Sequence, residues 1–339
     1  MSITVAPVGN SRILSVGTYR PKRVVPNSEI VDRIDSTDEW IVQRTGIESR
    51  RFAGDDETVI SMAKAACEIA LKRAKLTIAD IDTVILSTIS YPFQAPSAAT
   101  ELINELGNPK AAAFDISAAC AGFCYGVAMG SDLVRSGTSK NVLVIGVETL
   151  SDYTDPDDRA TAFIFADGAG AVVIGQSDQP RIGQTIWGSD ADSRDAITLT
   201  PSFLDFKKNP DKGVGELGWP NISQQGQVVF RWAVYSMSKV GLQALEAAGV
   251  SVDELGAFIP HQANIRIIES MAKEMKIPDS VLIADDIRTN GNTSAASIPL
   301  AMDRILEEHP ELHGKLALLI GYGAGLVYAG QVVELPPKP

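Results

Sequence analysis

Cys120 is the residue of this sequence best placed to act as a nucleophile. It lies in residues 115–123 (DISAACAGF), where a predicted short buried strand over 111–116 gives way to a predicted Ala/Gly-rich helix over 122–134. The free N–H groups and the positive dipole at the start of a helix favour an anion, so we expect a lowered thiol pKa and a reactive thiolate. The alternative is that Cys120 is a small apolar core residue, as most free cysteines are.

His261 and Asn292 offer two further polar groups suited to the same chemistry. His261 is the only one of the three histidines that follows an apolar strand, and Asn292 lies in the small-residue segment 291–297 (GNTSAAS). An imidazole and a carboxamide together can stabilise an oxyanion or an enolate. The alternatives are a satisfied core histidine and an asparagine that caps a helix. We interpret Cys67 and Cys124 as structural and expect no metal site.

Two other segments could bind a substrate. Residues 321–325 (GYGAG) follow a strand and precede another strand, which excludes a dinucleotide-binding loop and predicts a tight turn with N–H groups beside the thiol. Ser36 is expected to cap a helix on which Trp40 and Arg44, four residues apart, share one face. An aromatic ring beside a guanidinium suits stacking on a base, and a surface stripe is the alternative.

An internal repeat predicts how these residues are brought together. Residues 70–81 resemble residues 244–255, an offset of 174, and nearly the same offset places strand 143–146 on strand 318–321. Strands that alternate with helices favour parallel sheets with right-handed crossovers. We therefore predict an α/β fold of two duplicated halves related by a pseudo-twofold axis.

The repeat also predicts the domain organisation. Residues 1–181 form the half with Cys120, and residues 182–339 form the half with His261 and Asn292, so the three side chains can converge between the halves. The polar segment over about 190–226 is interpreted as a flap over this site, and a disordered surface connection is the alternative.

Composition limits the classes of function. The 339 residues are 45% hydrophobic and have a formal net charge of -12, which disfavours nucleic-acid binding but leaves room for an acidic partner on a local basic patch. No apolar run reaches the ~18 residues that span a bilayer, so no membrane association is expected. Three cysteines without a disulfide pattern, and no leader-like segment, predict a cytoplasmic protein.

Three motifs, DISAACAGF, IPHQAN and GNTSAAS in this order, resemble those of the β-ketoacyl-acyl-carrier-protein synthase III family of the thiolase superfamily. The resemblance extends from residue 12 to residue 333. It implies a homodimer with a layered α-β-α-β-α thiolase-like fold and a catalytic set of Cys120, His261 and Asn292. It further implies an oxyanion hole formed by N–H groups of Cys120, Gly323 and Ala324.

The same resemblance implies two binding surfaces. One would contact coenzyme A through the residues Ser36, Trp40, Arg44, Arg159 and Asn264. The other would bind acyl carrier protein through the residues Gln262, Ala263, Asn264, Ile265, Arg266, Arg231 and Lys273.

The reaction implied by the resemblance is a decarboxylative condensation of an acyl-CoA with malonyl-acyl-carrier-protein, without a metal or redox cofactor. Some relatives that prefer acetyl primers have a bulky Phe at the position of Ala95, which the partner subunit places in the acyl pocket, so Ala95 predicts branched or longer primers. The alternatives are a priming enzyme of a polyketide or other specialised pathway, and a catalytically silent subunit that binds carrier protein.

Overall fold

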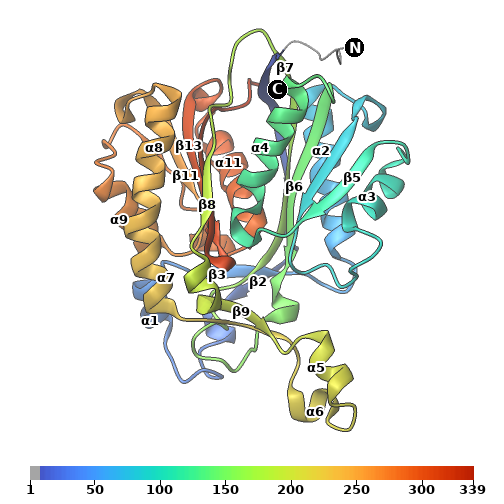
Figure 1. Ribbon diagram of the computed structural model, residues 1–339. Coiled ribbons are helices and arrows are strands. Elements are labelled where there is room, and N and C mark those ends of the chain that lie inside the picture. The colour runs from blue at the N-terminus through green and yellow to red at the C-terminus, as the bar shows by residue number, and fades with distance from the viewer. Residues whose placement is uncertain (1–7) are drawn as a thin grey trace.

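Two five-stranded sheets with the same strand order organise the computed structural model, which describes residues 8–339 (Figure 1). The first sheet has the order β1 (Asn10–Tyr19), β7 (Asp167–Ser177), β6 (Asn141–Thr149), β4 (Thr83–Ser87), β5 (Ala112–Ile116). The second repeats it as β8 (Ile186–Ser189), β14 (Val327–Glu334), β13 (Leu316–Gly323), β11 (Leu255–Pro260), β12 (Leu282–Ile283). The predicted duplicated α/β fold is confirmed. Residues 1–7, part of the stretch expected to lack a leader, lie outside the described range.

Each sheet is mixed, so the expectation of purely parallel sheets is wrong for one strand of each sheet, β7 and β14. β4 pairs in parallel with β5 and β6, and β11 pairs in parallel with β12 and β13. β7 and β14 are antiparallel to both of their neighbours. The physical reason is that no crossover helix joins β6 to β7 or β13 to β14, and a strand that returns directly must run antiparallel.

Helices cover and separate the sheets in five layers, as the resemblance implied. Helices α4 (Gly122–Arg135) and α11 (Ser297–Glu308) lie between the two sheets (Figure 1). The outer faces are covered by α2 (Val59–Ala74) and α3 (Ala98–Leu106) on the first sheet, and by α8 (Ser238–Ala248) and α9 (Ile265–Glu274) on the second. Buried residues of both halves form one central core, so a domain boundary near residue 181 stays a prediction.

Smaller elements complete the described chain. The short strands and helices are β2 (Arg23–Pro26), β3 (Ser49–Phe52), α1 (Asp38–Thr45), α7 (Gly226–Trp232) and α10 (Ile287–Asn290). The 3-10 turns outside the site are η1 (Asn27–Glu29), η2 (Ile78–Asp80), η4 (Leu150–Tyr153), η7 (Val252–Glu254) and η9 (Pro310–Leu312), and η6 (Ala233–Met237) is a π-helical turn.

The two central helices begin in the same unusual way. A 3-10 turn precedes each of them, η3 (Ala119–Ala121) before α4 and η8 (Ser294–Ala296) before α11. Ala119 and Ser294 have positive φ angles of 44° and 47°, and 294 minus 119 equals 175, within one residue of the offset of the repeat. Non-glycine residues in this region are strained and persist where the surrounding structure holds them. The repeat therefore preserves a tight turn at the start of both helices.

Strand β5 differs from its prediction as a buried strand. Among residues 8–339 it is the edge of the first sheet and pairs only with β4, and its residues are partly or fully exposed. Its Asp115 accepts hydrogen bonds from the N–H groups of Ala98 (2.7 Å) and Ala99 (2.8 Å) at the start of α3. The apolar run 111–116 therefore has a free edge rather than a second neighbouring strand.

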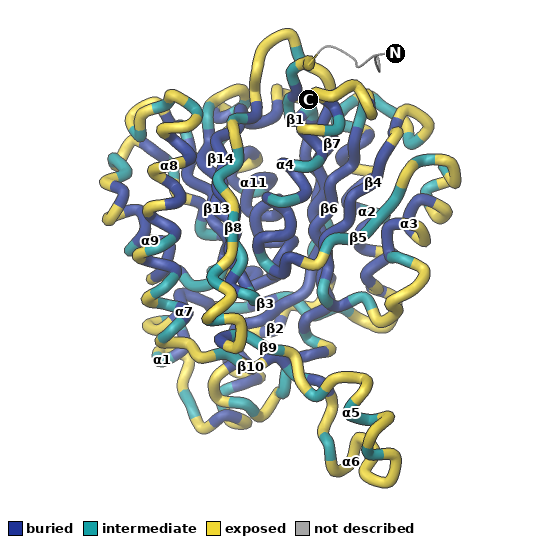
Figure 2. Tube along the Cα trace, in the orientation of Figure 1, coloured by how far each residue is buried: buried dark blue, intermediate teal, exposed yellow. Residues whose placement is uncertain are grey.

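Residues 190–226 form an ordered extension of the second half. After η5 (Ala191–Ala196), the strands β9 (Ile197–Thr200) and β10 (Asn221–Gln224) pair as a hairpin. Between them, α5 (Phe203–Lys208) and α6 (Gly213–Leu217) project from the body at the lower right of Figure 1. Figure 2 shows this projection as mostly exposed. The hairpin lies at the site, as described below, whereas the two helices extend away from it.

Candidate active site

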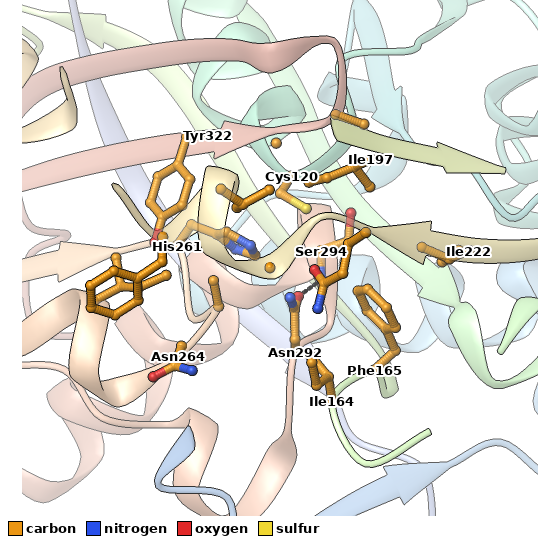
Figure 3. Close-up of a pocket in the computed structure, with 18 of the residues that line it drawn as sticks. Cys120, Ile164, Phe165, Ile197, Ile222, His261, Asn264, Asn292, Ser294 and Tyr322 are labelled. Carbon is orange, nitrogen blue, oxygen red and sulfur yellow. Dashed lines mark hydrogen bonds between the residues drawn. The ribbon is translucent and has the colours of Figure 1, made fainter. Parts of the chain in front are cut away.

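Cys120, His261 and Asn292 line one cavity of about 560 Å³ between the two halves (Figure 3). The three come from the ends of different elements: Cys120 from η3, His261 from the residue after β11, and Asn292 from the turn before η8. The structure therefore brings the three residues together, as predicted. Ile197 and Ile222 of the β9–β10 hairpin line the same cavity, so part of the segment 190–226 covers the site.

Cys120 lies deep in this cavity at the start of α4, but its expected lowered pKa is wrong. The side chain is partly accessible from the cavity, and burial among protein atoms raises the pKa of the thiol to about 12, with the charge of Glu148 adding to the rise. The nearby Ser294 hydroxyl and the backbone N–H of Cys120 act in the opposite direction. Desolvation of the anion outweighs the favourable helix start. The resting residue is therefore a neutral thiol, whose proton must be transferred before attack.

His261 is held as a neutral ring with a fixed tautomer. Its Nδ1 lies 2.7 Å from Ser297 Oγ, which also accepts the N–H of Gln262 at 3.3 Å. Among residues 8–339, Nδ1 is the only acceptor within reach of the Ser297 hydroxyl hydrogen, so we assign that hydrogen to Nδ1 and the ring proton to Nε2. Burial lowers the pKa of His261 to about 3. The imidazole therefore has a neutral Nε2–H that can donate a hydrogen bond.

Asn292 is fixed by its backbone and by its side-chain oxygen. Its N–H donates to Ile164 O and its carbonyl accepts from Ala166 N, both at 2.9 Å. Its Oδ1 accepts the N–H of Ser294 at 2.9 Å, the contact drawn in Figure 3. Asn292 therefore caps the turn, as the alternative interpretation held, while its NH2 group is left to donate to a bound molecule.

The turn after β13 approaches Cys120 closely. Gly323 and Ala324 line the cavity, and a Cβ atom at Gly323 would lie 2.7 Å from the backbone nitrogen of Cys120. Ala324 begins the 3-10 turn η10 (Ala324–Leu326). Only glycine permits this approach, which brings backbone N–H groups of the turn and of Cys120 to the same part of the cavity.

The cavity opens beside an aromatic ring flanked by two guanidinium groups. Arg44 and Arg159 lie 5.3 and 5.6 Å from the ring centroid of Trp40, which meets Phe163 edge-on at 5.5 Å. Arg44 lines the mouth of the cavity, and the exposed Arg159 also pairs with Asp35 at 3.8 Å. Trp40 and Arg44 share one face of α1, as expected.

Two neighbouring residues have structural contacts of their own. Thr37, not Ser36, caps α1 by accepting the N–H of Trp40 at 3.2 Å, so the capping role predicted for Ser36 is wrong by one residue. Asn264 lines the cavity, donates to Arg44 O at 2.9 Å and accepts the N–H of Arg266 at 2.9 Å. Asn264 thus connects α1 to the start of α9.

Comparison with known proteins assigns the chain to a family. The family model described as 3-oxoacyl-[acyl-carrier-protein (ACP)] synthase III matches residues 114–191, and its C-terminal counterpart matches residues 245–335. A β-ketoacyl-[acyl-carrier-protein] synthase III of Streptomyces coelicolor is 55% identical over 331 residues, with 96% of each chain covered. This chain belongs to the 3-oxoacyl-[acyl-carrier-protein] synthase III family. It is accordingly an acyltransferase of the condensing type.

Solved structures of the same family confirm the thiolase-like fold. A priming β-ketosynthase from a polyketide biosynthetic pathway superposes with a TM-score of 0.96 at 42% identity, and the match covers 100% of both chains. A 3-oxoacyl-[acyl-carrier-protein] synthase III from Aquifex aeolicus gives a TM-score of 0.87 at 36% identity, with 96% of this chain and 100% of that chain covered.

The residues expected to bind carrier protein divide into two groups. Arg231 and Arg266 of the synthase are exposed at the mouth of the cavity, and Lys273 is exposed further along α9. Gln262 and Ile265 are buried, so their side chains are not available to a partner and this expectation is wrong. The Gln262 amide donates to Pro260 O at 2.8 Å and accepts the N–H of Ile287 at 3.2 Å, which braces the loop.

Ala263 and Ala95 differ in their position relative to the cavity. Ala263 lines the synthase cavity beside Asn264. Ala95 is exposed in the loop 91–96 and does not line the cavity of this chain. A role for Ala95 in an acyl pocket therefore requires a second copy of the chain.

Sequence reasoning missed several residues around the synthase site. Ser297 orients His261, and the ring of Tyr322 meets that of His261 at 5.1 Å, edge-on. Glu148 and Ser294 lie behind Cys120 and influence the pKa of its thiol. Ser294 and Ser297 could have been found from the sequence, since they lie within the GNTSAAS motif. Glu148 could not, because a lone glutamate at the end of an apolar strand gives no local sign of function.

Arg50 supports the entrance from within. It is fully buried and donates to Val25 O at 3.2 Å and Phe163 O at 3.1 Å, and to Asn27 Oδ1. Burial lowers its pKa to about 10. These contacts hold Phe163 where it packs against Trp40.

Residues 8–339 contain no group of three or more His, Cys, Asp and Glu side chains arranged to hold a metal ion. None of the helices in the same range combines the length and apolar character that a membrane crossing requires.

Proposed function

We propose that this synthase condenses an acyl-CoA primer with malonyl-acyl-carrier-protein to give a 3-oxoacyl product, CoA and carbon dioxide, at the start of fatty acid synthesis. The observation that supports this most strongly is the placement of Cys120, His261 and Asn292 in one cavity with Trp40 and Arg44 at its mouth. The cysteine content further predicts action in the cytoplasm.

The first half-reaction transfers the acyl group to the enzyme. Coenzyme A binds with its adenine end beside Trp40, Arg44 and Arg159, and its pantetheine arm passes Asn264. The Cys120 thiolate attacks the thioester carbonyl, and N–H groups of Cys120, Gly323 and Ala324 stabilise the oxyanion. The close approach of Gly323 to Cys120 supports this arrangement. The carbon–sulfur bond to coenzyme A then breaks.

The second half-reaction forms the carbon–carbon bond. Malonyl-acyl-carrier-protein enters past Arg231, Arg266 and Lys273, and its carboxylate leaves as carbon dioxide. The resulting enolate accepts hydrogen bonds from His261 Nε2–H and the Asn292 NH2 group, then attacks the acyl-cysteine. Loss of carbon dioxide drives the step, so the proposed chemistry needs no metal or redox cofactor.

A homodimer formed along the free edge of β5 would complete the primer pocket. The strand has an unpaired edge, and the loop 91–96 beside it exposes Phe93. A partner's loop inserted at the pocket would present alanine at position 95, leaving space for a branched or longer acyl group. Sedimentation velocity should show a dimer at micromolar concentration, and a monomer would remove the basis for this pocket.

Intact mass measurement tests the proposed acylation directly. The protein is incubated with acetyl-, isobutyryl-, octanoyl- and lauroyl-CoA, with Cys120→Ala as the control. We expect an adduct from isobutyryl-CoA or a longer donor that is absent in the control, and narrower acceptance in Ala95→Phe. Use of acetyl-CoA alone would contradict the role given to Ala95, and the absence of any adduct would contradict the proposed function.

A specialised priming role is the second candidate. It is favoured by the likeness, over both full chains, to the priming β-ketosynthase of a polyketide pathway. Condensation assays with malonyl groups on a fatty-acid carrier protein and on a polyketide carrier protein distinguish the two. Product from only the polyketide carrier protein would favour the specialised role.

A further inference from the structure

Glu148 is a buried carboxylate whose two oxygens differ in their hydrogen bonding. It is fully buried at the end of β6, and its Oε2 accepts hydrogen bonds from Ser90 Oγ (2.7 Å), Ile89 N (3.0 Å) and Thr88 Oγ1 (3.1 Å). Its Oε1 is buried and has no hydrogen-bond partner within the described range 8–339. A neutral glutamine could accept the same three hydrogen bonds, so anchoring residues 88–90 does not by itself require a carboxylate.

Ser294 lines the same cavity as Cys120, and its turn η8 packs against β6, which carries Glu148, and against η3, which carries Cys120. Its Oγ is buried and makes no hydrogen bond of regular geometry, yet it is close enough to Cys120 and to Glu148 to lower the pKa of both. Its backbone has a φ of 47° and is held by the hydrogen bond from its N–H to Asn292 Oδ1 at 2.9 Å. The hydroxyl is therefore held near Cys120 and near Glu148, two groups that can exchange a proton.

The repeat shows that this turn does not need a serine. Ala119, the equivalent residue in the first half, adopts a φ of 44° with only a methyl side chain. The close packing that brings Ser294 to β6 depends instead on Gly146, where a Cβ atom would lie 2.1 Å from Ala295 O. A hydroxyl at position 294 thus serves something other than the backbone conformation.

We propose that Glu148 accepts the Cys120 thiol proton through Ser294 during acylation and returns it to the Cys120 thiolate when the condensed product is released. This inference rests on the proposed two-step function. It gives the thiol a proton acceptor on the side of the site opposite to the bound substrates.

The proton and electron pairs balance through the cycle. In acylation, Ser294 passes its hydrogen to Glu148 Oε1 and takes the Sγ hydrogen, the Sγ–carbon bond forms, and the coenzyme A thiolate leaves and takes a proton from water. In condensation, the enolate attacks the acyl carbon and the Sγ–carbon bond breaks. The Cys120 thiolate then recovers its proton from Glu148 by the same route. The net uptake is one proton, which the loss of carbon dioxide from a carboxylate requires.

The ionisation of the surrounding groups supports Glu148 over His261 as the acceptor. Burial raises the pKa of Glu148 to about 7 and that of the Cys120 thiol to about 12, whereas burial lowers the pKa of His261 to about 3. The carboxylate is therefore the stronger base of the two. The ionisable groups that feel the charge of Glu148 are Cys120 and Tyr153, whose pKa values it raises.

Alkylation by iodoacetamide tests this proposal without any acyl substrate. The rate of Cys120 modification is measured by mass between pH 5.5 and 9 in wild type, Glu148→Gln and Ser294→Ala. We expect a rise in the wild-type rate through a midpoint near pH 7, where Glu148 becomes a carboxylate, and at least a tenfold lower rate at pH 7.5 without this midpoint in both variants. Single-turnover acylation by isobutyryl-CoA should fall in parallel.

The opposite outcome is equally definite. If Glu148 acts only as a neighbouring charge, its neutralisation lowers the thiol pKa, and Glu148→Gln is alkylated as fast as wild type or faster, which overturns the proposal. Asp167→Asn is the matched control, because Asp167 is also a buried carboxylate and it accepts hydrogen bonds from Ala53 and Ser151 rather than from residues of the site. Ser294→Ala retains the residue type that Ala119 shows to fit the turn, so it decides the question if Glu148→Gln fails to fold. Normal alkylation profiles without any condensation product would contradict the proposed function instead.

Discussion

At the scale of single residues, the neutral state of His261 limits what this side chain can do. Its burial lowers the pKa to about 3, and Ser297 directs a hydrogen at Nδ1, so the ring proton stays on Nε2 across the physiological pH range. Such a ring is a hydrogen-bond donor rather than a base for the thiol. The role that fits it is stabilisation of the enolate together with Asn292.

This neutral state predicts the pH dependence of condensation. Between the unfolded value of about 6.5 and the folded value of about 3, the folded protein leaves His261 uncharged while the unfolded chain protonates it. We therefore expect protonation of His261 to cause no decrease in the rate of condensation between pH 7 and pH 5. Quenched flow of pre-acylated enzyme with malonyl-acyl-carrier-protein measures this rate. A loss of rate with a midpoint near pH 6.5 would show that His261 titrates normally. The same pKa shift makes the folded state less stable as the pH falls from 6.5 toward 3.

At the scale of elements, the site depends on glycines that let strand ends and helix starts approach. Gly146 of β6 faces η8, and Gly323 at the end of β13 faces η3. These two contacts, one in each half, place the turns that hold Ser294 and Cys120 against the strands that hold Glu148 and the proposed oxyanion hole. The pseudo-twofold repeat therefore matters to the chemistry because it creates two such turns.

A methyl group at Gly146 should displace the turn η8, which carries Ser294. Gly146→Ala places a Cβ 2.1 Å from Ala295 O, so η8 must shift. We expect a loss of about 1–3 kcal/mol in the free energy of unfolding, as for other overpacked cores, and a lower rate of Cys120 acylation. Chemical denaturation and single-turnover acylation measure the two effects.

Gly215→Ala is the matched control, because a Cβ at Gly215 of α6 meets no atom within 4 Å. Equal stability and acylation in the two variants would show that η8 adapts freely and that its position is not critical.

At the scale of the whole molecule, the charge at the mouth of the cavity is opposite in sign to the net charge of the chain. The chain has a net charge of -12, yet Arg44, Arg231 and Arg266 gather at the mouth of the cavity. An acidic partner is repelled by most of the surface and attracted at this mouth. This arrangement favours delivery of a thioester carried by an acidic protein.

Reversal of one mouth charge should weaken carrier-protein use. Arg266→Glu is expected to raise the KM for malonyl-acyl-carrier-protein roughly fivefold at low salt, as for about 1 kcal/mol, with a smaller effect at high salt. Steady-state assays at two ionic strengths measure it. Lys140→Glu is the control, because it makes the same change in net charge at an exposed position just before β6, at the end of the strand opposite to Glu148. An equal effect in both variants would mean that only the total charge matters.

The family, the duplicated α/β plan and the identity of the three central residues can all be predicted from the amino-acid sequence. Motif residues such as Cys120 and Asn292 stand out because local spacing, small neighbours and helix starts are visible in one dimension. The burial predicted for strand 111–116 is wrong because an apolar run does not reveal whether a second neighbouring strand pairs with it. Gln262 and Ile265 were misassigned as surface because a motif does not show which side of its backbone faces the core.

The ionisation of the site, in contrast, depends on how the two halves pack. The thiol pKa of Cys120 depends on desolvation by elements distant in sequence, and this outweighs the helix start that the sequence reveals. Glu148 and Ser294 are 146 positions apart (294 minus 148), and they meet because Gly146 lets the second half approach β6. Burial and through-space contact are properties of the packed halves, so no local pattern could have predicted them.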